Sequence, residues 1–152
     1  NTNGTYAVWD VDDNGAWTSG HGALDATEII DFEGTFGADL NGDGYTTFIG
    51  TTYDDAILGN AGDDQLTGGL GDDLLTGGAG NDQFNFSVGD GVDHITDYAA
   101  VSDLIRFVGL QFADLTITQA GSDVQIDYGA DDLLIVDNTA IAEFVEQEFQ
   151  FM

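Results

Sequence analysis

Residues 50–85 read GTTYDDAILGNAGDDQLTGGLGDDLLTGGAGNDQFN, which is one nine-residue phrase written four times, at 50–58, 59–67, 68–76 and 77–85. Every copy begins with Gly, and every copy has Asp at its sixth position and an apolar residue at its eighth. The sixth position is Asp55, Asp64, Asp73 and Asp82, and the eighth is Ile57, Leu66, Leu75 and Phe84. A looser copy, VGDGVDHIT at 88–96, follows a short insertion and keeps Asp93 and Ile95 in the same positions.

One apolar residue in nine is too sparse for a helix face and suits a very short strand with one side chain pointing inward. The six preceding residues must then turn the chain, which glycine allows through its positive φ angles. Two copies make one coil of strand, turn, strand and turn. No copy can bury its apolar residue alone, so coils must stack. The sequence therefore predicts a mainly β protein built around a parallel β-roll.

Stacking brings like charges together, because turns two copies apart lie above one another. We expect Asp55 above Asp73, Asp64 above Asp82, and Asp73 above Asp93. Two carboxylates about 4 Å apart repel by roughly 4 kcal/mol at an effective dielectric near 20. Carboxylates and turn carbonyls form an all-oxygen donor set that favours calcium over magnesium. The alternative, a flexible Gly/Asp linker, would not hold an apolar residue in phase.

These nonamers resemble the G-G-x-G-x-D-x-U-x calcium-binding repeat of RTX proteins. In that family, carbonyls two and four and the Asp of one turn, with carbonyls one and three and the Asp of the turn stacked on it, hold an ion. The resemblance implies a first calcium ion bound by Thr51, Tyr53, Asp55, Gly68, Leu70 and Asp73. It implies a second bound by Asn60, Gly62, Asp64, Gly77, Ala79 and Asp82. A third, across the insertion, would use Gly69, Gly71, Asp73, Val88, Asp90 and Asp93. We expect two or three ions in the roll.

The charge balance of the 152 residues narrows the possible partners. There are 29 acidic residues and one basic residue, Arg106, for a net charge of -28. Such a surface repels nucleic acid and anionic membrane and attracts cations. No Cys is present, so an extracellular form needs a staple other than disulfides. No apolar run approaches the roughly 18 residues of a membrane span.

Residues 23–48 predict a helix followed by the first half of an EF-hand calcium loop. The loop would use Asp39, Asn41 and Asp43 at alternate positions, then the Tyr45 carbonyl. Its twelfth position is Gly50 instead of a bidentate Glu, so it lacks its strongest ligand unless an acidic residue from elsewhere folds over it. The alternative is a polar Asx/Gly turn.

Residues 6–20, YAVWDVDDNGAWTSG, predict a hairpin that turns at Asn14-Gly15, with Trp9 and Trp17 as a cross-strand pair. A calcium loop beginning at Asp10 is the less favoured alternative. Trp9 and Trp17 are also candidates for stacking on sugar rings. Residues 6–48 together are similar to a tryptophan-containing module that accompanies RTX repeats in bacterial secreted proteins.

After the repeats, DLIRFVG, LTITQAGSDVQIDYG and LLIVDN predict strands, with a hairpin turn near Gly121-Ser122. TAIAEFVEQEF is either a short helix or a final strand. A β cap of this kind would cover the open end of the stack. The ending EFVEQEFQFM resembles the C-termini of type I secretion substrates. We divide the chain into a hairpin, helix and loop module at 1–48, the β-roll at 49–97, and the cap at 98–152.

These features predict a non-catalytic, calcium-binding RTX module of a secreted bacterial protein, located outside the cell or on its surface. It would fold on binding calcium and support export by the type I secretion machinery. His21 and His94 fall in no recognisable catalytic pattern. The chain begins at Asn1, which is typical of a fragment or a processed product. Two alternatives stay open: a glycan-binding module beside a polysaccharide-active enzyme, and a surface protein that self-assembles with calcium.

Overall fold

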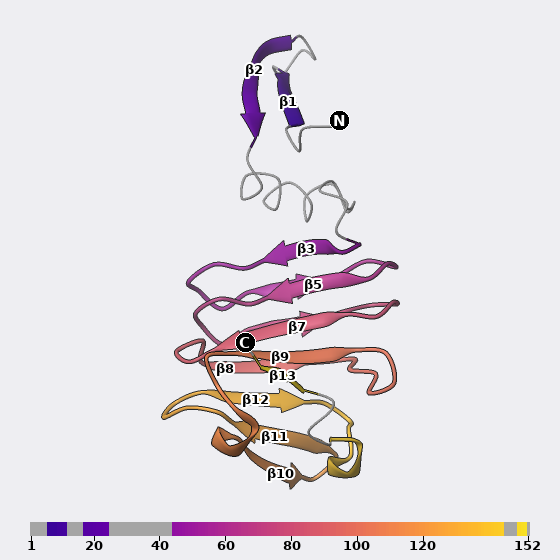
Figure 1. Cartoon of the computed structure of the whole chain (residues 1–152), viewed down its shortest axis with the longest axis vertical. Helices are drawn as coiled ribbons and strands as arrows, with labels where there is room; N and C mark the ends of the chain where they lie inside the picture. Colours follow the sequence, from indigo (N-terminus) through magenta and orange to yellow (C-terminus); the bar gives the residue numbers. More distant parts are fainter. Residues whose placement is uncertain (1–5, 12–16, 25–43, 145–148, 152) are drawn as a thin grey trace.

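The computed structural model describes residues 6–11, 17–24, 44–144 and 149–151. Two sheets stack their strands coil by coil (Figure 1). One sheet has the order β13-β9-β7-β5-β3, and the other has the order β10-β11-β12-β8-β6-β4. The first contains Thr46–Ile49 (β3), Asp64–Thr67 (β5), Gln83–Ser87 (β7), Leu104–Val108 (β9) and Phe149–Phe151 (β13). The second contains Ala56–Leu58 (β4), Leu74–Thr76 (β6), Val92–Ile95 (β8), Thr116–Ala120 (β10), Asp123–Asp127 (β11) and Leu133–Val136 (β12).

Successive repeats alternate between the two sheets, as a β-roll requires. Each strand pairs in parallel with the strand two further along, so that Leu66 faces Phe84 and Leu75 faces Ile95. The predicted parallel β-roll is therefore confirmed. The only helical elements in the described residues are two short 3₁₀ turns, Phe112–Asp114 (η1) and Ile141–Glu143 (η2). The predicted helix before the repeats lies outside the described residues.

The core lies between the sheets and is built from the eighth position of each repeat. Leu66, Leu75, Phe84 and Ile95 are completely buried, while Ile57 in the first copy is partly buried against the same core. The intervening strand residues point outward, as Leu74 shows with 46% of its surface exposed. The short strands thus bury one side chain per repeat, as their spacing predicts.

The insertion after the fourth copy widens the roll. Asp55 and Asp73 are 18 residues apart, whereas Asp73 and Asp93 are 20 apart. The longer β7 adds Phe86 to the core, with its ring centroid 5.9 Å from that of Phe107. Widening therefore makes room for an aromatic core.

Residues after 97 continue both sheets before they cap them. β9 adds to β7 in parallel, and β12 adds to β8 in parallel. The hairpin β10–β11 then pairs antiparallel through Ala120 and Asp123, and Gly121 has a φ of 70°, as the predicted turn requires. The final strand β13 pairs with β9, but it includes only Phe149 of the segment TAIAEFVEQEF, and Ile141–Glu143 of that segment form η2. Neither the helix nor the strand alternative therefore holds for the whole described part of the segment. The division at 97/98 stays a prediction, and both sheets cross it.

Tyr6–Val11 (β1) and Trp17–Leu24 (β2) form an antiparallel pair, which confirms the hairpin. Trp9 faces Gly20, and Trp17 faces Val11, so the predicted Trp9–Trp17 pair is wrong. The reason is distance from the turn, since Trp9 precedes Asn14 by five residues and Trp17 follows Gly15 by two. The predicted turn itself lies outside the described residues. No described segment is a helix long and apolar enough to cross a membrane.

Adjacent leucines on β6 provide a matched test of the roll. Leu75→Ala should lower the free energy of unfolding by about 2–5 kcal/mol, because it removes a buried side chain and leaves a cavity. Leu74→Ala, on the exposed side of the strand, should cost no more than about 0.5 kcal/mol. Denaturant unfolding in excess calcium measures both. Equal losses would contradict the inward and outward assignment.

Candidate metal centre

The sixth-position aspartates form two ladders, one beside each sheet. In each ladder the amide N–H of one residue donates to the carboxylate of the residue one coil later. On one side, Asp55 donates to Asp73 Oδ1 at 2.8 Å, and Asp73 donates to Asp93 Oδ1 at 3.1 Å. On the other side, Asp64 donates to Asp82 Oδ1 at 3.0 Å. The predicted stacking of these aspartates is therefore confirmed.

The fifth-position residues form separate, outer ladders. Asp54 Oδ1 accepts the Asp72 amide at 3.1 Å, and Asp72 Oδ1 accepts the Val92 amide at 3.0 Å. Asp63 Oδ1 accepts both the amide and the side chain of Asn81, and these bonds lower the Asp63 pKa. These exposed carboxylates link successive coils directly. The inner, sixth-position carboxylates are the ones left for a cation.

Turns that stack on one another approach so closely that the first position must be glycine. A Cβ on Gly50 would overlap the Gly68 carbonyl oxygen and lie 2.9 Å from Asp55 Oδ2. A Cβ on Gly59 would overlap the Gly77 carbonyl oxygen and lie 2.6 Å from Asp64 Oδ2. Each of these glycines thus faces a carbonyl oxygen and a carboxylate oxygen, and both oxygens are predicted ligands. The arrangement at Gly50 recurs nine residues later at Gly59.

Two inner carboxylate oxygens, Asp64 Oδ1 and Asp73 Oδ2, are buried and have no hydrogen-bond partner. Leaving a buried acceptor unsatisfied costs about 1–3 kcal/mol, and more for a charged group. Within the described residues, no three Asp, Glu or His side chains converge on one point. A cation here must therefore take main-chain carbonyls as well, which suits a hard ion such as calcium. The residues present fit that ion.

Burial raises the pKa of Asp64, Asp73, Asp82 and Asp93, and neighbouring carboxylates raise it further. The pKa of Asp82 rises to about 6, with Asp103 and Asp64 as like-charged neighbours. The pKa of Asp93 rises to about 7, although the Tyr128 hydroxyl donates to its Oδ2 at 3.3 Å. Without a cation, the folded ladder disfavours its own charged form.

The structure brings together residues of the first and second predicted sets in matching ways. Thr51 N–H donates to Asp55 Oδ2 at 2.6 Å, and the Thr51 carbonyl accepts the Leu70 amide at 3.2 Å. Nine residues later, Asn60 N–H donates to Asp64 Oδ2 at 2.6 Å, and its carbonyl accepts the Ala79 amide at 3.2 Å.

The fourth-position residues and the third predicted set also lie in stacked turns. Gly71 lies against the backbone of Tyr53, Gly80 against the Gly62 carbonyl, and Gly91 against the Gly71 carbonyl. In the third set, the Asp90 carbonyl accepts the Gly71 amide at 2.8 Å, while Val88 is 61% exposed. Its turn is longer than the others, so its geometry differs from that of the first two.

Sequence reasoning missed three aspartates beyond the nonamers. Asp103 extends the second ladder, accepting the Asp82 amide on Oδ1 at 3.1 Å and the Ala99 amide on Oδ2 at 2.8 Å. An apolar residue two positions later, Ile105, was the available signal. Asp97 accepts the amides of Gly77 and Gly78. Asp132 accepts the amides of Gly89 and Gly91, across more than 40 residues, and no local pattern announces that.

The calcium loop and the sugar-stacking tryptophans upstream of the repeats stay predictions. Tyr45 directly precedes β3, so the residues after it form a strand instead of the exit helix of an EF-hand. Asp39, Asn41 and Asp43 lie outside the described residues. Trp9 and Trp17 lie on β1 and β2, and sugar stacking by them stays a prediction.

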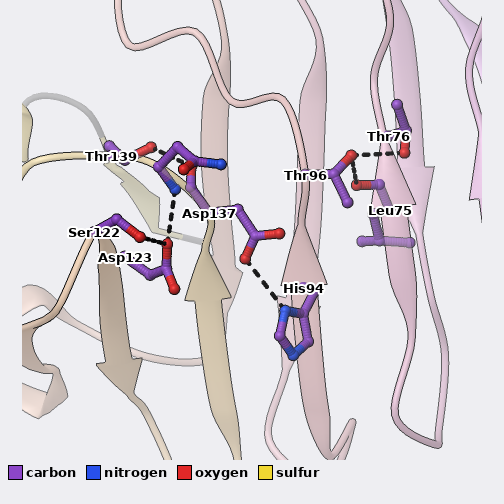
Figure 2. Close-up of polar contacts among 9 residues, drawn as sticks. Leu75, Thr76, His94, Thr96, Ser122, Asp123, Asp137 and Thr139 are labelled. Carbon is purple, nitrogen blue, oxygen red and sulfur yellow. Dashed lines mark hydrogen bonds and ion pairs between the residues drawn. The ribbon is translucent and has the colours of Figure 1, made fainter.

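His94 takes part in a contact that ties the roll to its cap. Its Nδ1 lies 3.3 Å from Asp137 Oδ1, between β8 and the end of β12 (Figure 2). Figure 2 also shows that the nearby Ser122 hydroxyl bonds with Asp123, at 2.8 Å. The His94–Asp137 contact supports the parallel pairing of β12 with β8.

The fold and the aspartate ladders define a calcium-binding β-roll. Residues 49–84 match, in four copies, the RTX calcium-binding nonapeptide repeat. The repeat segment thus consists of RTX repeats, and such repeats bind calcium. The comparison with curated proteins found no match to the chain.

A comparison with solved structures bears on the architecture. The chain is similar to extracellular lipase LipA from Serratia marcescens, with a TM-score of 0.55 and 24% identity over 70% of this chain. It covers 21% of that lipase. It is also similar to the AlgE6R2 subunit from the Azotobacter vinelandii mannuronan C5-epimerase, with a TM-score of 0.48 and 20% identity. That match covers 70% of this chain and 91% of the subunit. The lipase comparison supports the fold.

Adjacent acids allow a charge-matched test of the inner ladder. Asp73→Asn should weaken calcium binding by about tenfold or more, since it removes a charge-bearing ligand worth at least about 1.4 kcal/mol. Asp72→Asn removes the same charge one residue away, keeps an oxygen for the Val92 amide, and should change affinity by less than about threefold. Calorimetric calcium titration measures both. Equal weakening would mean that bulk charge, and not the ladder, attracts the ion.

The raised pKa values of Asp82 and Asp93 give a pH test in calcium-free solution. Both lie above the ordinary value of 3.8, so the folded chain binds protons more tightly than the unfolded chain. The stability that these two groups contribute is complete below about pH 4 and is lost as pH rises through about 6 to 7. Circular dichroism in calcium-stripped buffer should show more strand at about pH 5.5 than at about pH 8. A rise in strand content with pH would refute this.

Proposed function

We propose that the chain is a non-catalytic folding module of a larger secreted bacterial protein, and that calcium switches its folding on outside the cell. The observation that carries the proposal is the pair of buried ladders, in which Asp64 and Asp73 each keep one oxygen without a hydrogen-bond partner. In a chain with a net charge of -28, burying such carboxylates costs free energy unless a cation neutralises them.

Under this proposal, the first two ions are bound in equivalent sites. The set Thr51, Tyr53, Asp55, Gly68, Leu70 and Asp73 is repeated nine residues later by Asn60, Gly62, Asp64, Gly77, Ala79 and Asp82. The matching hydrogen bonds of Thr51 and Asn60 support this equivalence. The third set, Gly69, Gly71, Asp73, Val88, Asp90 and Asp93, uses the longer turn and would bind with a different affinity.

The energetics support a switch. A ligand that binds only the folded chain stabilises it by about 2.7 kcal/mol per site at a hundredfold excess over Kd. Two or three such sites would add roughly 5–8 kcal/mol, comparable to the whole stability of a small domain. Calcium would thus do the work that disulfides do in other secreted domains, in a chain without cysteine.

The topology supports folding after export by the type I machinery. The last strand, β13, pairs with β9 through Phe149 and Ile105. Phe149 and Phe151 lie 6.0 and 6.3 Å from the Phe107 ring, so the end of the roll is completed by a strand far along the chain from the repeats. At the low calcium of the cytosol, inner-ladder repulsion would keep the chain extended and able to thread a channel.

The proposal predicts that calcium folds the wild-type chain but not one lacking the inner carboxylates. A variant with Asp55, Asp64, Asp73 and Asp82 all changed to Asn should pass through a type I channel and stay protease-sensitive in millimolar calcium. Wild type should gain strand signal cooperatively at calcium concentrations on the order of 10⁻⁴–10⁻³ M. Circular dichroism and limited proteolysis of the secreted protein provide the readouts.

The control changes the outer ladder, with Asp54, Asp63 and Asp72 replaced by Asn. That variant loses nearly as much charge but keeps the inner ligands, so it should fold with calcium. A protease-resistant inner variant would refute the switch, as would a wild-type spectrum that is fully native in excess chelator.

A further inference from the structure

The roll begins one repeat, or half a coil, earlier than the matched repeats. β3 pairs in register with β5, so that Thr46 faces Asp64 and Phe48 faces Leu66. Phe48 packs against the core, as an eighth-position residue does. Gly44 has a φ of 100°, close to the 124° of the fourth-position Gly71. Residues 44–49, the leading coil, therefore continue the nonamer phase, with Thr46 in the sixth position where the other copies have Asp.

Asp64 keeps an unsatisfied oxygen at this coil. In the lower rungs, the Oδ1 of each inner aspartate accepts the amide of the residue one coil earlier, as Asp82 Oδ1 does from Asp64. The residue one coil before Asp64 is Thr46, whose amide donates instead to the Asp63 carbonyl at 3.0 Å. Asp64 is completely buried, and its Oδ1 has no partner. The other oxygen, Oδ2, is already bonded by the Asn60 amide at 2.6 Å.

The unsatisfied oxygen lies next to further hard donors. The Thr46 side chain forms a hydrogen bond with the Asp64 carboxylate, and only 6% of Thr46 is exposed. By the nonamer phase, Gly44, Gly59 and Ala61 stand at the repeat positions whose carbonyl groups are the predicted ligands of the proposed sites further along the roll. One carboxylate, one hydroxyl and several carbonyls suit calcium, with weaker binding than at a site with two carboxylates.

We infer that the leading coil and the turn 59–64 hold an additional calcium ion, with Asp64 Oδ1 and the Thr46 hydroxyl as side-chain ligands. The inference rests on the proposed calcium-binding function and adds a site outside the matched residues.

Two substitutions at Thr46 test the site in opposite directions, on the full chain and with calcium as the probe. Thr46→Val removes the hydroxyl and should lower the number of bound ions by one in equilibrium dialysis. Thr46→Asp restores the carboxylate of the other copies and should tighten one site by about tenfold. In calcium-free buffer the new carboxylate of Thr46→Asp repels Asp64, so the thermal unfolding midpoint of this variant should be lower than that of wild type. In calcium the midpoint should be higher than that of wild type.

Thr47→Val is the matched control, because Thr47 lies on the same strand and alternation turns its side chain to the other face. It should keep the wild-type number of ions. The inference is overturned if Thr46→Val binds as many ions as wild type, or if Thr46→Asp lowers the thermal midpoint equally with and without calcium. If wild type binds no calcium, the proposed function itself fails. If wild type binds calcium and Asp73→Asn weakens it, while the Thr46 variants behave like Thr47→Val, only the additional site fails.

Discussion

The structure depends on the burial of a carboxylate against the next coil. Asp73, Asp82 and Asp93 each accept, on one carboxylate oxygen, the amide of the residue one coil earlier, and these bonds fix the coil spacing and the strand register together. The same carboxylate brings a negative charge close to those above and below it, as the raised pKa values of Asp82 and Asp93 show. Backbone hydrogen bonding thus draws the coils together while charge separates them, and a cation in the turns removes the conflict.

The first three repeats each have two neighbouring acids, and the two have different roles. Successive positions point to opposite sides of the chain, so Asp72 faces solvent and links to Val92, while Asp73 faces the turns and is 1% exposed. The outer bond needs no metal, because an exposed carboxylate stays hydrated. The inner carboxylate is buried away from water. Under the proposed function, calcium dependence is therefore a property of one residue in nine, although the whole chain is acidic.

The nine-residue period was enough to predict the roll, the buried Leu66, Leu75 and Phe84, and the stacking of Asp55 on Asp73. These features recur in every copy, so the same prediction is supported four times by the sequence. The roles of Asp103 and Asp132 could not be predicted in the same way, because coils of different length and a contact over 40 residues leave no period. The leading coil was also missed. Its sixth position is Thr46 instead of Asp, and the sequence around Gly44 matches the start of an EF-hand loop better than it matches the nonamer.

One end of each ladder carries a neutral residue. Thr46 stands one coil before Asp64, and the register of β8 with β12 places Leu134 one coil after Asp93. A carboxylate on a last rung would have a coil on one side only, and so fewer carbonyls to share an ion with. At Asp93 the cap instead supplies the Tyr128 hydroxyl, and beyond it the core becomes aromatic, with the Tyr128 and Phe107 rings 5.1 Å apart. The cap therefore ends the ladder by replacing metal-dependent contacts with a hydrogen bond and apolar packing, which hold the last coil without an ion.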